Sequence, residues 1–340
     1  MVLTIKTLSI QDQKSIEHFF QLPQETLLKV MKKYLEKKYE NVISTEDFII
    51  AVGDIPIALV AHLDTIFSVP PTDIYYDRNK NVMWSPQGLG ADDRAGVFAI
   101  TQIVKKGYKP TVILTTNEEI GGIGAAKMVS IFPSSPTDLK YIIELDRQGS
   151  IDCVFYSCDN PDFEEYIENF NFITNFGTFS DISIICPIWK IAGVNLSIGY
   201  YNEHNKIETL NIGQMFNTIK QVQKMLDSAE TASYFEYKEF KYNFKCFSTN
   251  NLLDGWDPSF GISKNEWAEF MSPQTKCHKC GEYDFDYNLF PVLFSNYDIK
   301  MYCVDCLNNS PNIHWCEKCG DPYYDNRKNN EKEVCYNCRE

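Results

Sequence analysis

The sequence predicts an α/β protein, with a mixed, mostly parallel sheet flanked by helices and a small cysteine-rich domain after it. Helical and strand patterns alternate between about residues 20 and 230, as they do where helices connect the strands of a sheet. Four Cys-x-x-Cys pairs then follow, all after residue 276. The 340 residues leave room for one large domain and one small one.

Each element of the alternating region is predicted from its own pattern. Residues 23–39 carry apolar side chains at helical spacing, and residues 93–106 predict an amphipathic helix. Residues 48–64 contain two β-rich runs around a Gly-Asp turn, which predicts a hairpin. The remaining predicted elements are strands at 110–119, 141–146, 153–158 and 194–201, and helices at 122–132 and 211–226.

The pattern also predicts where the domains divide. Residues 1–230 form the α/β domain, and residues 272–340 form the cysteine-rich domain. Residues 231–271 form an aromatic and charged connector between them, because the periodicity blurs there.

Charge and hydropathy exclude several classes of protein. A formal net charge of −14 argues against a protein that binds a nucleic-acid backbone, because such binding needs a basic surface. No apolar run approaches the roughly 18 residues of a membrane span. The first residues lack the order of a signal peptide. We therefore expect a cytoplasmic protein without membrane or nucleic-acid partners.

The paired cysteines predict two structural zinc ions. Two cysteines three residues apart place both sulfurs on one tetrahedral ion, and disulfide scaffolds would spread their cysteines more evenly. In the simplest pairing, the first two pairs share one zinc and the last two pairs share another, but the spacing also allows a cross-braced pairing. The eight predicted ligands are Cys277, Cys280, Cys303, Cys306, Cys316, Cys319, Cys335 and Cys338.

Acidic and histidine side chains follow the predicted strands where each strand ends. The carboxyl ends of the strands in an open α/β sheet are the usual place for ligands. Each residue alone has an ordinary structural explanation, such as a helix cap or a solvated surface acid. Together they indicate a site for zinc, or for cobalt or manganese in its place. The residues are His62, Asp64, Asp92, Asp93, Glu118, Glu119, Asp146 and His204.

These motifs resemble, in order and spacing, those of the co-catalytic zinc aminopeptidase and carboxypeptidase clan, the M20/M28-type metallopeptidases. The segments HLDT, GLGADDRAG, TTNEEIGGIGA, ELD and YYNEH carry the resemblance, which covers about residues 20–230. It implies a zinc-exopeptidase-like catalytic domain with two divalent metals, and zinc-ribbon modules would follow it.

The resemblance also implies a role for each residue. One metal would be held by His62, Asp92 and Asp146. The second would be held by Asp92, Glu119 and His204. Glu118 would be the general base, and Asp64 would orient the His62 imidazole. Tyr200, Tyr201 and Arg147 are candidate donors to the oxyanion because they lie close in sequence.

This reading implies hydrolysis of a peptide or related amide bond by a metal-bridging water that Glu118 deprotonates. Only 57 residues separate Asp146 from His204, too few for the lid domain of the M20 branch. The 29 residues between His62 and Asp92 likewise leave no room for the large insertion of the tetrahedral, M42-like branch. The chain therefore resembles the lidless, M28-like aminopeptidases most closely. Residues 177–189 resemble a polar loop that some relatives place near the metals, although a turn before a strand explains them equally well.

Two other functions remain open. The core could be a degenerate hydrolase that acts as a binding scaffold, or a deacylase or amidase on a non-peptide amide. The cysteine-rich tail could contact a protein partner or only stabilise the chain. The tail carries more acids than bases, and tetrathiolate zinc adds negative charge, so nucleic acid is not an expected partner. The expected substrate is a peptide or an acylated amine.

Overall fold

The computed structural model describes two compact units of the chain, the first within residues 8–239 and the second within residues 275–325. The described residues are 8–239, 275–280, 283–284, 289–293, 299–303, 306–307, 309–315 and 322–325. Among them, no helix has both the length and the apolar character needed to cross a membrane.

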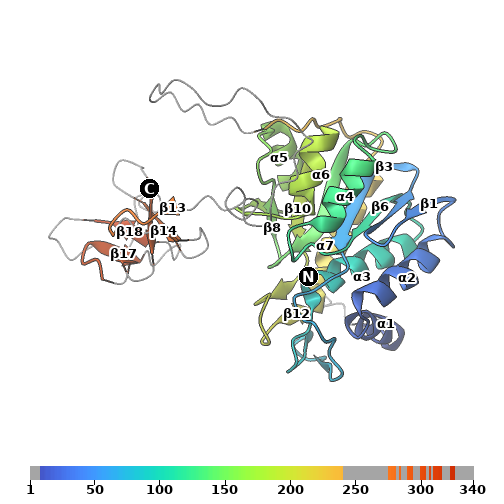
Figure 1. Cartoon of the computed structure of the whole chain (residues 1–340), viewed down its shortest axis with the longest axis horizontal. Helices are drawn as coiled ribbons and strands as arrows, with labels where there is room; N and C mark the ends of the chain where they lie inside the picture. Colours follow the sequence, from blue (N-terminus) through green and yellow to red (C-terminus); the bar gives the residue numbers. More distant parts are fainter. Residues whose placement is uncertain are drawn as a thin grey trace, which may run out of the picture. The chain divides into compact units, whose positions relative to one another are not determined.

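An eight-stranded mixed sheet forms the centre of the first unit (Figure 1). Its strands are β1 (Asn41–Ser44), β2 (Phe48–Val52), β3 (Ile55–His62), β6 (Pro110–Thr115), β7 (Tyr141–Arg147), β8 (Asp152–Val154), β9 (Ile173–Thr174) and β10 (Gly193–Ser197). Their order across the sheet is β1-β2-β6-β3-β7-β10-β8-β9. The four middle strands, β6, β3, β7 and β10, run parallel to their neighbours within this group. Their carboxyl ends therefore lie along one edge of the sheet.

Helices cover both faces of the sheet, which confirms the predicted fold class (Figure 1). The helices are α1 (Ile10–Phe20), α2 (Gln24–Leu35), α3 (Ala91–Lys105), α4 (Ile123–Ile131), α5 (Pro161–Glu168), α6 (Asp181–Trp189) and α7 (Ile212–Asp227). Side chains alternate along β3, so Leu59 and Ala61 join the core that contains α3 and α7. Ala58 and Val60 join the opposite core, with α4 and α6.

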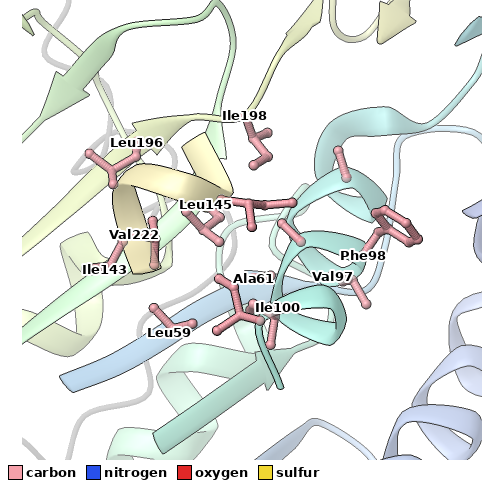
Figure 2. Packing of buried hydrophobic residues seen from close by; sticks show 14 of the residues in the cluster. Leu59, Ala61, Val97, Phe98, Ile100, Ile143, Leu145, Leu196, Ile198 and Val222 are labelled. Carbon is pink, nitrogen blue, oxygen red and sulfur yellow. The ribbon is translucent and has the colours of Figure 1, made fainter. Parts of the chain in front are cut away.

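The larger core fixes α3 against the middle of the sheet. Figure 2 shows Val97 and Ile100 of α3 close to Ala61 of β3, and Val222 of α7 near Ile143 of β7. These side chains are all fully buried. Because α3 begins at the edge where the middle strands end, this packing determines where the first residues of α3 lie.

A second, four-stranded sheet contributes one more loop to that edge. Its strands are β4 (Tyr75–Asp77), β5 (Val82–Trp84), β11 (Tyr200–Tyr201) and β12 (Thr209–Asn211), in the order β11-β12-β5-β4. The predicted strand 194–201 is thus two strands in two different sheets, divided near Gly199, whose φ is +97°. The loop between β11 and β12 carries His204.

The predicted hairpin at residues 48–64 is wrong. β2 and β3 are not neighbours, because β6 lies between them and pairs antiparallel with β2 and parallel with β3. The Gly-Asp turn instead bonds to the chain that leads into β6, with the amides of Asp54 and Ile55 donating to the Lys109 carbonyl at 3.0 and 3.1 Å. The turn signal therefore marks a connection that passes over the position of β6, and not a hairpin.

Residues 177–189 also differ from the turn and strand considered for them. Asp181–Trp189 is a helix, α6, whose N-terminus is capped by Ser180 through a capping box with Ser183. Its buried residues, Ile182, Ile185, Cys186 and Trp189, follow helical spacing. The β-branched isoleucines obscured that period in the sequence. Of the predicted strand 153–158, only residues up to Val154 are in β8.

The chain after α7 packs against the first unit. Residues 231–239 belong to the region expected to be a connector. Phe235 is buried among Tyr141, Phe163 and Tyr166. Its amide donates to the Lys140 carbonyl at 2.9 Å, and its carbonyl accepts from the Ala192 amide at 2.9 Å.

The second unit is built from short strands around a small core. Its strands are β13 (Thr275–Lys276), β14 (Tyr283–Asp284), β15 (Leu289–Leu293), β16 (Ile299–Cys303), β17 (Ile313–Trp315) and β18 (Pro322–Tyr324). β13 pairs with β14, and the other four form a sheet in the order β16-β15-β18-β17. Val292, Tyr302 and Leu307 form the buried cluster.

Candidate metal centre

The histidine and acidic residues predicted from the strand ends lie together at the carboxyl edge of the middle strands. His62 ends β3, Asp146 lies near the end of β7, and Glu118 and Glu119 follow β6. Asp92 lies in the first turn of α3. His204 comes from the loop after β11, where its backbone adopts φ +58°.

His62 lies at the bottom of the site and is fully buried. Its Nε2 atom lies 3.0 Å from Asp92 Oδ1, 3.5 Å from Asp146 Oδ1 and 3.9 Å from Glu118 Oε2. One imidazole nitrogen thus faces three carboxylates. That donor set, nitrogen with several oxygens, suits a divalent cation such as zinc.

His204 faces the same cluster from the other side. Its Nε2 atom lies 2.8 Å from Glu119 Oε2 and 3.2 Å from Asp92 Oδ2. Asp92 therefore directs one carboxylate oxygen toward His62 and the other toward His204. A carboxylate in this position can serve two cations at once.

Asp64 connects the His62 imidazole with the glutamate pair. Its Oδ1 lies 3.3 Å from His62 Nδ1. The same carboxylate accepts hydrogen bonds from the backbone amides of Glu118, at 3.1 Å, and Glu119, at 3.0 Å. Asp64 therefore fixes the backbone that carries both glutamates. His62 Nδ1 has no hydrogen-bond partner, so the orientation of His62 by Asp64 stays a prediction from the sequence.

Asp146 is held by groups that were not expected to act on it. Ser180 donates from Oγ to Asp146 Oδ2 at 3.1 Å, and Asn195 Oδ1 accepts the Asp146 amide at 2.9 Å. The Tyr200 hydroxyl donates to the Asp146 carbonyl at 3.1 Å. Tyr200 was a candidate oxyanion donor, but its hydroxyl is engaged here.

The other two oxyanion candidates are also engaged. Tyr201 donates from its hydroxyl to Gln214 Oε1 at 2.8 Å, and Arg147 donates from Nη2 to the Phe176 carbonyl at 3.2 Å. Tyr201 and Arg147 are therefore not aimed into the cluster by these contacts, whereas the Tyr200 hydroxyl also lies 3.3 Å from Asp146 Oδ1.

Glu208 is the residue that sequence reasoning missed most clearly. Its side chain is buried, and it accepts backbone hydrogen bonds from three consecutive residues at the start of α3. Oε2 accepts from Gly90 at 2.5 Å and Ala91 at 3.1 Å, and Oε1 accepts from Asp92 at 3.1 Å. The loop that carries His204 thereby holds the backbone of Asp92. No periodicity or spacing in the sequence marks this contact.

Distance alone makes Asp93 as good a candidate metal ligand as Asp92. Ligand atoms of His62, Asp92 and Glu119 lie within 4.8 Å of one another, and so do those of His62, Asp93 and Asp146. However, the two oxygens of Asp93 accept hydrogen bonds from the Gly96 amide at 2.9 Å and the His62 amide at 3.2 Å. Asp93 is therefore already committed to the backbone, whereas Asp92 faces the two imidazoles.

Burial and charge shift the protonation of the cluster strongly. Burial raises the pKa of Glu118 to about 9 and that of Asp146 to about 7, with the Asp92 charge adding to the second shift. Hydrogen bonds to Asp92 and Glu119 raise the pKa of His204 to about 11. Burial alone would raise the pKa of Asp92, but hydrogen bonds from His204 and His62 hold it well below its usual range.

The residues present fit two divalent cations. The cluster combines two imidazoles with several carboxylates, and each proposed group of three residues includes Asp92. Glu119 Oε1 is buried and has no hydrogen-bond partner, so this oxygen has lost its water without another donor. A cation would compensate both the oxygen and the accumulated negative charge.

In the second unit, three predicted zinc ligands lie close together. Ligand atoms of Cys277, Cys280 and Cys306 lie within 4.8 Å of one another. Cys303 is the last residue of β16. The Cys303 side chain and Cys316, Cys319, Cys335 and Cys338 lie outside what the structure describes.

No family model and no curated protein matches the sequence, whereas solved structures match its fold. The chain is similar to the aminopeptidase PepT of Bacillus cereus, with 14% identity over 64% of this chain and 98% of that one and a TM-score of 0.50. A tripeptidase from Staphylococcus aureus matches 67% of this chain and 100% of its own, at 13% identity and a TM-score of 0.51.

A third match is the TET aminopeptidase of a marine sediment thaumarchaeon. It is 14% identical over 65% of this chain and 99% of its own length, with a TM-score of 0.52. At such low identity these matches establish the fold and not the activity. The chain has the mixed α/β fold of these peptidases.

Proposed function

We propose that the first unit is a two-metal hydrolase that cleaves peptide bonds, acting as an aminopeptidase. The single observation that carries this proposal is the Asp92 carboxylate, which directs one oxygen to His62 and the other to His204. A carboxylate placed between two nitrogen donors can bind two metals, one through each oxygen. The fold shared with an aminopeptidase, a tripeptidase and a TET aminopeptidase supports the peptide substrate.

Each side chain of the cluster has one role in this proposal. His62, Asp92 and Asp146 would hold one metal, and Asp92, Glu119 and His204 would hold the other. Zinc is the expected metal, and cobalt or manganese suits the same donors. When bound, the metals would lower the pKa of the attacking water and polarise the scissile carbonyl.

Glu118 is the proposed general base. Its carboxylate lies 3.9 Å from His62 Nε2, beside the cluster. It would take a proton from the attacking water and return it to the leaving amine. Asp64 holds the amides of Glu118 and Glu119 at 3.1 and 3.0 Å, so the base and the adjacent ligand keep a fixed spacing.

The organisation of the chain favours the lidless, M28-like branch. Residues 147–203 include α5, α6, β8, β9 and β10, all of which belong to the helices and strands of the core. This leaves no stretch for a lid domain between Asp146 and His204. Without a lid, the site lacks the extra groups that would clamp a substrate carboxylate, which favours release of N-terminal residues.

We propose structural zinc in the second unit. The proximity of Cys277 and Cys280 to Cys306 supports the sequential pairing, in which the first two Cys-x-x-Cys pairs share an ion. A cross-braced arrangement would separate these two pairs. The second zinc, on the last two pairs, stays a prediction from the sequence.

Mass spectrometry of a mixed peptide library tests the proposed activity. The full chain, loaded with zinc or cobalt, should remove residues stepwise from the N-terminus, and Glu118→Gln should leave the library intact. Trimming from the C-terminus would keep the chemistry but contradict the aminopeptidase assignment. An intact library with both proteins, with metals bound, would favour a non-peptide amide or a binding scaffold.

A further inference from the structure

A cleft of about 410 Å³ adjoins the proposed metal centre, and its lining includes the proposed ligand Glu119 and the neighbouring Asp64. Its walls come from four segments: the turn into α2, the loop after β3, the start of α3 and the loop after β6. Apolar and polar side chains line the cleft in about equal number. The main apolar side chains are Phe20, Phe67, Pro70, Pro71, Leu89 and Ile120.

Most of the larger polar side chains in the cleft are already paired with one another or with the backbone. Gln24 donates to Asn117 Oδ1 at 3.2 Å and accepts the Asn117 amide at 3.0 Å. Arg94 donates from Nη1 to the carbonyls of Phe19 and Leu22 at 2.6 and 2.9 Å, whereas its Nε is buried without a hydrogen-bond partner. The cleft therefore offers a ligand mainly apolar contact.

The charged side chains that are accessible at the cleft are acidic. Glu25 is exposed at the rim, and the inner acids Asp64 and Glu119 have partners in the site. These carboxylates would repel an acidic ligand, and the one base among the lining residues, Arg94, is buried with its charge near Asp64 and Asp93. A basic ligand would gain only the exposed Glu25, and burying its charge in the apolar part without a partner would cost free energy.

The wall formed by Phe67 is held close to the start of α3. A Cβ atom on Gly88 would lie 2.3 Å from the Phe67 ring, and one on Gly90 would lie 2.9 Å from Thr65 Cγ2. The two glycines, both with positive φ, therefore allow the loop after β3 to rest on the segment that leads into α3. The backbone at these two glycines therefore fixes the shape of this wall before any ligand binds.

We propose that this cleft binds a large apolar side chain of the residue beside the scissile bond. The inference rests on the proposed function and names its preferred substrates, peptides with leucine, phenylalanine or methionine at the cleavage site. Ligand pockets are typically apolar concavities of this volume with a few polar groups at one end. Here the polar end is the metal centre.

Hydrolysis of two tripeptide series by the metal-loaded full chain tests the proposal. One series varies the first residue of X-Gly-Gly and the other the second residue of Gly-X-Gly, with X as leucine, phenylalanine, glycine, lysine or glutamate. In one of these two series, kcat/KM for leucine and for phenylalanine should exceed kcat/KM for glycine by at least about tenfold. A few buried methylenes provide discrimination of this size. Lysine and glutamate should fall near or below glycine.

Substitutions in the wall should change this preference. Phe67→Ala should lower the leucine-to-glycine ratio of kcat/KM by about tenfold, and Ile120→Glu should raise the lysine-to-leucine ratio. Ile131→Glu is the matched control, because Ile131 is also exposed, at 57% against 67% for Ile120, and does not line the cleft. It should leave both ratios unchanged.

The outcomes separate this inference from the proposed function. Hydrolysis with equal rates for all side chains, a lysine preference, or ratios that both wall variants leave unchanged would overturn the apolar cleft and keep the peptidase. If no peptide is cleaved, the proposed function fails. Calorimetric titration with leucinamide, lysinamide and glycinamide then tests whether the cleft binds an apolar side chain. Binding of leucinamide alone, weakened by Phe67→Ala, would support the cleft, and equal or absent binding would overturn it.

Discussion

The Asp92 carboxylate depends on groups far from it in the sequence. Glu208 accepts the backbone amides of Gly90, Ala91 and Asp92, and it follows His204 in the same loop. Asp93 anchors the other side of the turn by accepting the amides of Gly96 and His62. The position of one proposed bridging ligand is therefore determined by the loop after β11 and the end of β3 together.

Replacing the proposed base should stop the reaction and leave the metals in place. Glu118→Gln should lower kcat by about 10² to 10⁴, the usual contribution of a general base, with little change in KM. Steady-state kinetics on a tripeptide and metal analysis of the same preparation measure this. Wild-type rates in the amide variant would exclude Glu118 as the base, and loss of bound metal would make it a ligand instead.

Glu208→Gln should displace the backbone of Asp92, although Glu208 itself does not contact the substrate in this proposal. The new amide group directs a donor toward backbone amides that need acceptors, at a cost of about 1–3 kcal/mol for each buried group left unpaired. We expect a lower melting temperature and weaker metal binding, measured by calorimetric titration with zinc. Lys206→Gln, an exposed change in the same loop, is the control and should bind zinc as the wild type does.

The strand ends in the sequence predicted the residues of the cluster, but not the residues whose hydrogen bonds hold the cluster in place. Asp64 and Asp146 follow buried runs, so the topology brings them to one edge whatever the details of the loops. Glu208 and Asn195 carry no such signal, because their partners are backbone groups more than a hundred and about fifty residues away. Tyr200 was one of three candidate oxyanion donors by proximity in sequence, and its hydroxyl contacts Asp146.

At the scale of elements, local patterns predicted the type of each segment better than its partner. The runs at Phe48–Val52 and Ile55–His62 are strands, as expected. Their pairing was wrong because β6, which joins the sheet 48 residues after β3 ends, is inserted between them. A sequence signal for a turn carries no information about a third strand that arrives later.

The close contact of α3 with β7 offers a test at this scale. A Cβ atom on Gly96 would lie 2.3 Å from the Leu145 carbonyl and 2.4 Å from Asp93 Oδ1. Gly96→Ala should therefore push α3 from the sheet and lower the free energy of unfolding by about 1–3 kcal/mol. Urea denaturation measures the change.

Because Asp92 lies one turn before Gly96, the same variant should lose hydrolytic activity even at temperatures where it is folded. Gln102→Ala, a less buried change on the same helix, serves as the control and should retain stability and activity. Normal stability in Gly96→Ala would show that α3 is held less tightly than these distances require.

At the scale of the whole molecule, the described core clusters of the first unit contain only residues up to Phe235. The described core of the second unit contains only residues between Val292 and Tyr324. Neither cluster includes a residue from the other unit, so each unit has its own stabilising core.

A protein that ends at residue 244 should consequently fold and keep its hydrolytic activity within about twofold, since all proposed ligands of the two catalytic metals precede that point. Circular dichroism and tripeptide hydrolysis measure both properties. An unfolded or inactive truncated protein would show that the second unit completes the first.

The most direct test of the central claim is a metal titration followed by both binding and hydrolysis. The metal-free protein ending at residue 244 is titrated with zinc while release of the N-terminal residue from a tripeptide is recorded. We predict two zinc ions bound per chain, no release without metal, and full activity at the second equivalent. Hydrolysis that continues after complete metal removal, or a protein that binds no zinc, would contradict the two-metal peptidase.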